Sequence, residues 1–113
     1  MKYLLAIENK VTFKVVGSLT ETASREKKFN FSLTCDRLDQ ETINTRLKDK
    51  SEQMGEFMQS ITTGWADQRL VLADSGEPAE FDADSFALLM SVAGMPSVCF
   101  HAYLRAVAAK EKN

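Results

Sequence analysis

The sequence predicts an α+β fold, in which an N-terminal antiparallel β-hairpin or small sheet is followed by about four α-helices. Apolar and polar residues alternate near the N-terminus, which is typical of strands with one buried face. After residue 39, apolar residues recur every three or four positions, as they do in amphipathic helices. Strands therefore come first and helices follow, without the strand–helix alternation of a parallel sheet.

The 113 residues fit one domain, mainly β over residues 1–38 and mainly α over residues 39–113. A hydrophobic content of 44%, with only five Gly and two Pro, excludes a low-complexity or disordered chain. The apolar run at residues 3–7 is shorter than the ~7–15 residues of a secretory signal, and no run approaches the ~20 residues of a membrane span. We therefore expect neither a secretory signal nor a membrane partner.

Two strands are predicted at the start of the chain. Residues 11–15 and residues 29–35 both alternate between apolar and polar side chains, so the two segments are expected to pair antiparallel. Residues 17–26 between them are polar and rich in turn formers, which predicts a long, mobile connection. Residues 3–7 are a candidate third strand.

Two helices are predicted next. Asp39 is the expected N-cap of a helix that runs through Leu47, with Ile43 on the same face. A second helix is predicted from about Ser51, and Gly64 is expected to end it. Its apolar residues form one stripe, which comprises Met54, Phe57, Met58, Ile61 and Trp65.

A polar turn near residues 73–82 separates these elements from a third helix. Residues 69–72 before the turn are short and β-like. Asp82 is the predicted N-cap of the third helix. The apolar face of that helix comprises Phe86, Leu89, Met90 and Ala93.

A fourth helix is predicted after the break at Gly94, because Pro96 is suited to the first turn of a helix. It is expected to end near Lys110 and Lys112, whose positive charges suit the C-terminal end of the helix dipole. Its main apolar face comprises Phe100, Tyr103, Leu104 and Val107, and a second face carries Ala102, Ala106 and Ala109.

The sequence predicts no catalytic, cofactor-binding or metal-binding site. A nucleophilic cysteine needs a neighbouring base, but His101 lies two residues from Cys99, about 200° around a helix. One His and two Cys match no zinc spacing, and the acidic residues 74–84 lack the pattern of a calcium loop. Glycine-rich phosphate loops and a GxSxG motif are absent. Cys35 and Cys99 are expected to be buried, reduced thiols.

The charge distribution bears on the class of partner. The net charge of −2 excludes a strongly basic nucleic-acid binder, because neutralising phosphates needs a surplus of Lys and Arg. Residues 1–50 carry a net charge of +3, whereas residues 51–113 carry −5. Such an asymmetry can orient a partner or a second copy of the chain without identifying either.

The apolar helix faces are the remaining candidates for a functional surface. Methionine beside aromatic side chains can form an adaptable surface for an apolar partner segment. The alternative is that these faces pack into the domain's own core, as short helices on a sheet must. The candidate partner-binding residues are Met54, Phe57, Met58, Ile61, Trp65, Phe100 and Tyr103.

Several short motifs occur in an order typical of one protein family. They are Gly64–Trp65, an Asp74-x-Gly76-x-Pro78 turn, Phe81, a helix with Phe86, Leu89 and Met90, Ala102–Tyr103, Arg105, and the terminal Lys112–Asn113. Paired strands containing Phe13 and Phe31 precede them. In these features the chain resembles the tail assembly chaperones of long-tailed bacteriophages.

The resemblance implies a role that requires binding and no catalysis. It implies that the chain binds the tape measure protein, keeps it soluble and helps tail-tube subunits polymerise around it. The tail-tube protein and a second copy of the chain are further expected partners. The protein would act in the bacterial host's cytoplasm and be absent from the mature virion. Ribosomal frameshifting near Glu111–Asn113 would yield a longer second product.

Two other functions remain open from the sequence. The chain could be a self-associating structural component, such as a ring subunit at the head–tail junction or the tail terminus. It could also be a small enzyme that uses Cys35 or Cys99, although neither cysteine has a visible base.

Overall fold

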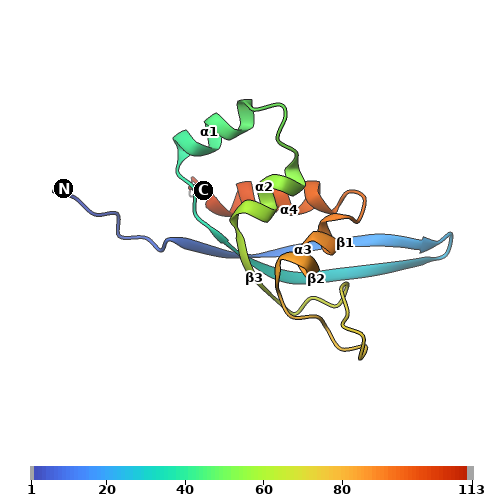
Figure 1. Ribbon diagram of the computed structural model, residues 1–113. Helices are drawn as coiled ribbons and strands as arrows, with labels where there is room; N and C mark the ends of the chain where they lie inside the picture. The colour runs from blue at the N-terminus through green and yellow to red at the C-terminus, as the bar shows by residue number, and fades with distance from the viewer. Residues whose placement is uncertain (1, 112–113) are drawn as a thin grey trace.

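The computed structural model describes residues 2–111 and has an α+β arrangement of three strands and four helices (Figure 1). The fold class predicted from the sequence is thereby confirmed. The elements in chain order are β1 (Lys10–Thr22), β2 (Arg25–Asp36), α1 (Gln40–Lys48), α2 (Met54–Ile61), β3 (Thr62–Ala66), α3 (Ala83–Met90) and α4 (Met95–Val107).

The β1–β2 hairpin is longer than predicted, and its two strands pair antiparallel from Lys10↔Asp36 to Thr22↔Arg25. The long connection expected over residues 17–26 is wrong, because only Ala23 and Ser24 separate the strands. Gly17, which resembles a turn residue in the sequence, lies opposite Phe29 in the ladder. A Cβ atom at Gly17 would lie 2.5 Å from Cζ of Phe29, so glycine there makes room for the ring rather than for a turn.

The third strand of the sheet comes from a different part of the chain than predicted. Residues 3–7 form no strand, whereas β3 pairs antiparallel with β2 to give the order β1-β2-β3. α2 ends at Ile61, and Thr62 begins β3 while its hydroxyl donates a 2.6 Å hydrogen bond to the Met58 carbonyl. β-Branched and aromatic residues favour a strand here, so Gly64 and Trp65 lie within β3 rather than at a helix end.

The hydrophobic core lies between one face of the sheet and helices α2, α3 and α4 (Figure 1). Val15, Leu33 and Cys35 of the sheet are fully buried. Aromatic contacts join α2 to α4. The ring centroid of Phe57 on α2 lies 5.1 Å from that of Phe100 and 6.0 Å from that of Tyr103, both on α4. The opposite face of the sheet is polar, with a hydrogen bond between the Thr12 and Thr34 hydroxyls.

The predicted caps of two helices are confirmed. The carboxylate of Asp39 accepts a 2.8 Å hydrogen bond from the Thr42 amide at the start of α1. The carboxylate of Asp82 accepts a 2.7 Å bond from the Ser85 amide at the start of α3. These bonds satisfy amides that have no partner within the helix, and they lower the pKa of both carboxyl groups.

The ends of several elements differ from the prediction. α2 begins at Met54 with Gln53 as its N-cap, and α3 ends at Met90, which leaves Ala93 exposed in the following turn. Residues 69–72 contribute only a single bridge, between Leu72 and Pro78. α4 ends at Val107, before the expected residues 110–112, of which Lys112 lies outside the described residues together with Asn113.

Within residues 2–111, no single helix is long and apolar enough to cross a membrane. α3 and α4 reach the necessary length and composition only when taken together, and they are bent by 105° relative to one another.

Tyr103 anchors α4 to the end of β2. Its buried hydroxyl donates a 2.8 Å hydrogen bond to the Asp36 carbonyl and accepts a 3.0 Å bond from the Leu38 amide. Both backbone groups lie where β2 ends, so Tyr103 satisfies them in place of a neighbouring strand. Burial of the phenol raises the pKa of Tyr103.

We predict that Tyr103→Phe lowers the free energy of unfolding by about 1–3 kcal/mol, because a backbone amide and a carbonyl lose their partner inside the protein. Urea denaturation of the variant and the wild-type chain measures the difference. Tyr3→Phe is the matched control, since the Tyr3 side chain is exposed and its hydroxyl has no such role. Equal stability of the Tyr103 variant and the control would contradict this assignment.

Candidate functional site

Most of the partner-binding residues predicted from the sequence lie in the core. Phe57, Met58 and Ile61 of α2, and Phe100 and Tyr103 of α4, are all buried. The apolar faces of both helices therefore point into the domain's own core, as the alternative interpretation predicts. A partner cannot reach these five side chains in the folded domain. Met54, by contrast, is 41% exposed at the start of α2.

Trp65 is half-buried and joins two of the sequence motifs. Its indole N–H donates a 3.2 Å hydrogen bond to the carbonyl of Ala79, which directly follows Pro78. Its ring also makes an edge-to-face contact with Phe81, at 5.4 Å between centroids. Trp65 thus contacts the residues that directly follow the Asp-x-Gly-x-Pro turn, in which Gly76 has the left-handed conformation at φ +90°.

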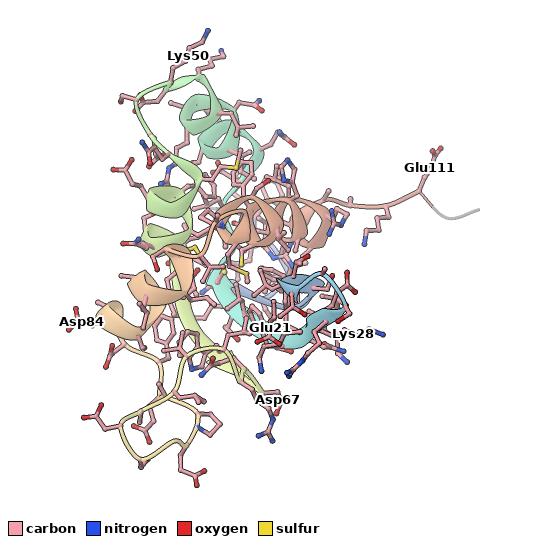
Figure 2. All side chains as sticks on the ribbon, turned by 90° about the vertical axis from the view of Figure 1, so that its right-hand side faces the viewer. Glu21, Lys28, Lys50, Asp67, Asp84 and Glu111 are labelled. Atoms are coloured by element: carbon pink, nitrogen blue, oxygen red, sulfur yellow. The ribbon has the colours of Figure 1, made fainter. Side chains whose placement is uncertain are left out.

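Gln68 holds the loop between β3 and α3 together, although nothing in the sequence singles it out. Its buried side-chain amide donates to the carbonyls of Val71 (2.9 Å) and Ala79 (3.2 Å). Its Oε1 accepts from the amides of Leu70 (3.1 Å) and Val71 (2.8 Å). Figure 2 shows this loop, which begins at Asp67, at the opposite end of the molecule from Lys50. The acidic turn is therefore presented by an ordered loop.

A groove of about 530 Å³ lies beside α1, at a place that the sequence did not indicate. Its walls come from the N-terminal segment, the residues that follow β2, α1, and the end of α4. The apolar lining residues are Leu5, Ile7, Leu38, Ile43, Leu47, Leu104, Val107, Ala108 and Ala109. Because they belong to four separate segments and share no motif, periodicity in the sequence could not reveal that they meet.

Arg37 brings a polar group to this apolar groove. One terminal nitrogen of its guanidinium donates to the Val107 carbonyl at 3.4 Å. Its Nε is buried and has no hydrogen-bond partner among the described residues. A buried donor without a partner is unfavourable, so this nitrogen lowers the stability of the fold at the groove.

α1 forms one wall of the groove and is attached to the body largely through Arg46. The guanidinium of Arg46 pairs with both carboxylate oxygens of Glu52 and donates to the Ser60 hydroxyl at 2.8 Å. It also lies 4.2 Å from the centroid of the Phe57 ring. Ile43 is the one buried residue of α1, and it lies outside the main core cluster.

An exposed apolar segment precedes β1 and borders the groove. Tyr3 is 81% exposed, Leu4 96%, Leu5 84% and Ile7 57%, and residues 2–8 form neither helix nor strand. Figure 1 shows this segment extending away from the body of the molecule. Large apolar side chains that remain in water at consecutive positions are typical of an interaction surface.

The two cysteines are buried and unpaired, as the sequence predicts. Burial raises the pKa of Cys35 to about 11 and that of Cys99 to about 12, so both thiols are protonated near neutral pH. The nearest hydrogen-bonding group to Cys35 is the Thr62 hydroxyl, at 3.4 Å. His101 is exposed, and its Nδ1 lies 2.8 Å from the Ser97 carbonyl. This arrangement activates neither thiol for nucleophilic attack.

Among residues 2–111, no three His, Cys, Asp or Glu side chains are grouped so that they could hold a metal ion. The apolar groove and the exposed N-terminal segment are the candidate site, because they offer the largest set of accessible apolar side chains described above.

Compared with protein families, curated proteins and solved structures, the chain matches none. The geometry of the fold alone defines the class of site, which is an apolar groove beside an exposed apolar segment.

We predict that neither Cys35 nor Cys99 reacts with a thiol reagent in the native protein at pH 8, because both are buried and protonated at that pH. Both should react as soon as the chain is unfolded in denaturant. The change in absorbance of a disulfide reagent measures this. Rapid reaction of either thiol under native conditions would contradict the burial and revive the cysteine-enzyme alternative.

Proposed function

We propose that this chain is a non-enzymatic binding protein that holds an apolar segment of a partner in the groove between α1, the end of α4 and residues 5–9. The observation that carries the proposal is the groove itself, which is lined by apolar side chains and bordered by further exposed ones. Apolar grooves of this size accommodate the hydrophobic face of an amphipathic helix or an extended peptide.

The energetics are adequate for a specific complex. Burying three large apolar anchors from a partner would supply about 5–9 kcal/mol before the entropic costs of association. The groove contributes apolar surface, while polar lining residues such as Gln40 and Asn44 can fix the position of the bound segment.

Within this class, we propose the particular role of a phage tail assembly chaperone. A tape measure protein is very long and helical, so it exposes apolar stripes that must be covered until the tail tube surrounds it. The proposal is supported by the order of the motifs and by the hydrogen bond from Trp65 to Ala79, the residue that directly follows the Asp-x-Gly-x-Pro turn. The chaperone would act in the bacterial host's cytoplasm, with the tail-tube protein as a possible second partner, and would be absent from the mature virion.

A longer product made by frameshifting near Glu111–Asn113 belongs to this proposal. Of these three residues, Lys112 and Asn113 lie outside the described residues. The groove is formed by residues before this point, so both products would carry it.

The second candidate is a ring-forming structural component of a phage head–tail junction or tail. It is favoured by the exposed segment before β1 and by the position of β1 at an edge of the sheet, because both features suit contacts between identical subunits.

We predict that Leu47→Glu weakens binding of the co-expressed tape measure protein at least about tenfold, which corresponds to about 1.4 kcal/mol. Leu47 lines the groove and is 51% exposed, so a carboxylate there places charge against a bound apolar segment without disturbing the core. The amount of tape measure protein that co-purifies with the tagged chain measures the effect.

Leu88→Glu is the matched control for this variant. Leu88 is also a helical leucine and is 57% exposed, but it lies on α3 and outside the groove. Equal retention of the tape measure protein by the two folded variants would reject the groove as the binding surface.

A further inference from the structure

The N-terminal segment exposes about as much apolar surface as the largest patch of a typical monomer, and patches of that size are often functional. Taking roughly 200 Å² for each large side chain, Tyr3, Leu4, Leu5 and Ile7 together expose on the order of 600 Å². A contiguous patch of that size on a monomer marks an interaction site. The segment therefore requires an occupant, and the groove beside it is an apolar surface of the same chain.

The tip of the segment cannot fill the groove from which it emerges. Leu5 and Ile7 already form part of the wall of that groove, whereas Tyr3 and Leu4 line neither of the cavities bordered by the segment. In an extended chain, Tyr3 lies about 13 Å from Ile7. The tip thus lies beyond the rim of its own groove, and the groove of a second copy is an apolar surface that can receive it.

We propose that two copies of this chain associate by exchanging their N-terminal segments, so that Tyr3 and Leu4 of each copy enter the groove of the other. The arrangement is reciprocal, because each chain supplies one segment and one groove, and it closes about a two-fold axis. The tip would lie against Leu38, Leu47 and Leu104, which line the groove.

The area available is what a stable dimer needs. Tyr3 and Leu4 of each copy expose about 350 Å², so two exchanged tips, each covered by an equal area of the opposite groove, bury on the order of 1,400 Å² in total, which lies within the range for stable, specific interfaces. Charge also favours the exchange, because Lys2 precedes the tip while the groove that receives it carries two carboxylates, Glu8 and Asp39, against one cation, Arg37. The same groove would then be occupied either by a second copy or by a client.

The test uses the purified full chain without any client, so its outcome is independent of the proposed chaperone function. We expect sedimentation equilibrium to show a dimer for the wild type and a monomer for Tyr3→Ser combined with Leu4→Ser. Neither substitution touches the core, so both chains should have the same circular dichroism spectrum. The matched control is Leu72→Ser combined with Leu88→Ser, which removes two exposed apolar residues elsewhere and should remain a dimer.

A cross-link tests the geometry directly. Chains carrying Leu4→Cys are mixed with differently tagged chains carrying Leu47→Cys and are oxidised; the native Cys35 and Cys99 are buried and do not compete. We expect a disulfide between the two tagged chains, and none when Leu88→Cys replaces Leu47→Cys. A wild-type chain that is monomeric up to its solubility limit, or a dimer that survives the Tyr3 and Leu4 substitutions, would overturn the proposal.

Discussion

The position of the groove depends on one buried hydroxyl group. Tyr103 binds the Asp36 carbonyl and the Leu38 amide at the point where β2 leaves the sheet, and its ring packs against Phe13 and Phe57. This fixes the last turns of α4 beside the backbone that leads to α1. Arg37, between the two bonded residues, then reaches the Val107 carbonyl and completes the floor of the groove. The site is therefore a consequence of how the core is closed.

Patterns within single segments allowed much of the fold to be predicted from the sequence. Period-two alternation identified the central parts of both long strands, because it directly reflects which side chains face the core. Asp39 and Asp82 were identifiable as caps because capping depends on amides only a few residues away. The features that depend on distant residues were not predicted. Gly17 is explained by Phe29 across the hairpin, and β3 exists only because β2 offers it an edge.

The candidate binding surface illustrates the same limit more sharply. An apolar stripe that faces the core and one that faces a partner have the same periodicity, so the pattern in α2 could not separate the two. Met58 is wholly buried, whereas Leu47 and Leu4 are exposed, although the sequence around them has a less regular apolar pattern. Gln68 is a comparable case, because its four hydrogen bonds become apparent only when the loop around it is folded. The candidate surface could therefore be located only from the three-dimensional arrangement of the chain.

The attachment of α1 has a mechanical consequence. The sheet, α2 and α4 share a packed aromatic core and form a stiff body, but α1 buries only Ile43 and is tied to that body by the polar contacts of Arg46. Tilting α1 outward would strain those contacts while leaving the core intact, so one wall of the groove is compliant and the floor is rigid. Such a groove accepts side chains of different sizes at nearly the same position. That tolerance would suit the proposed chaperone role, in which one groove holds many similar stretches of a long partner in turn.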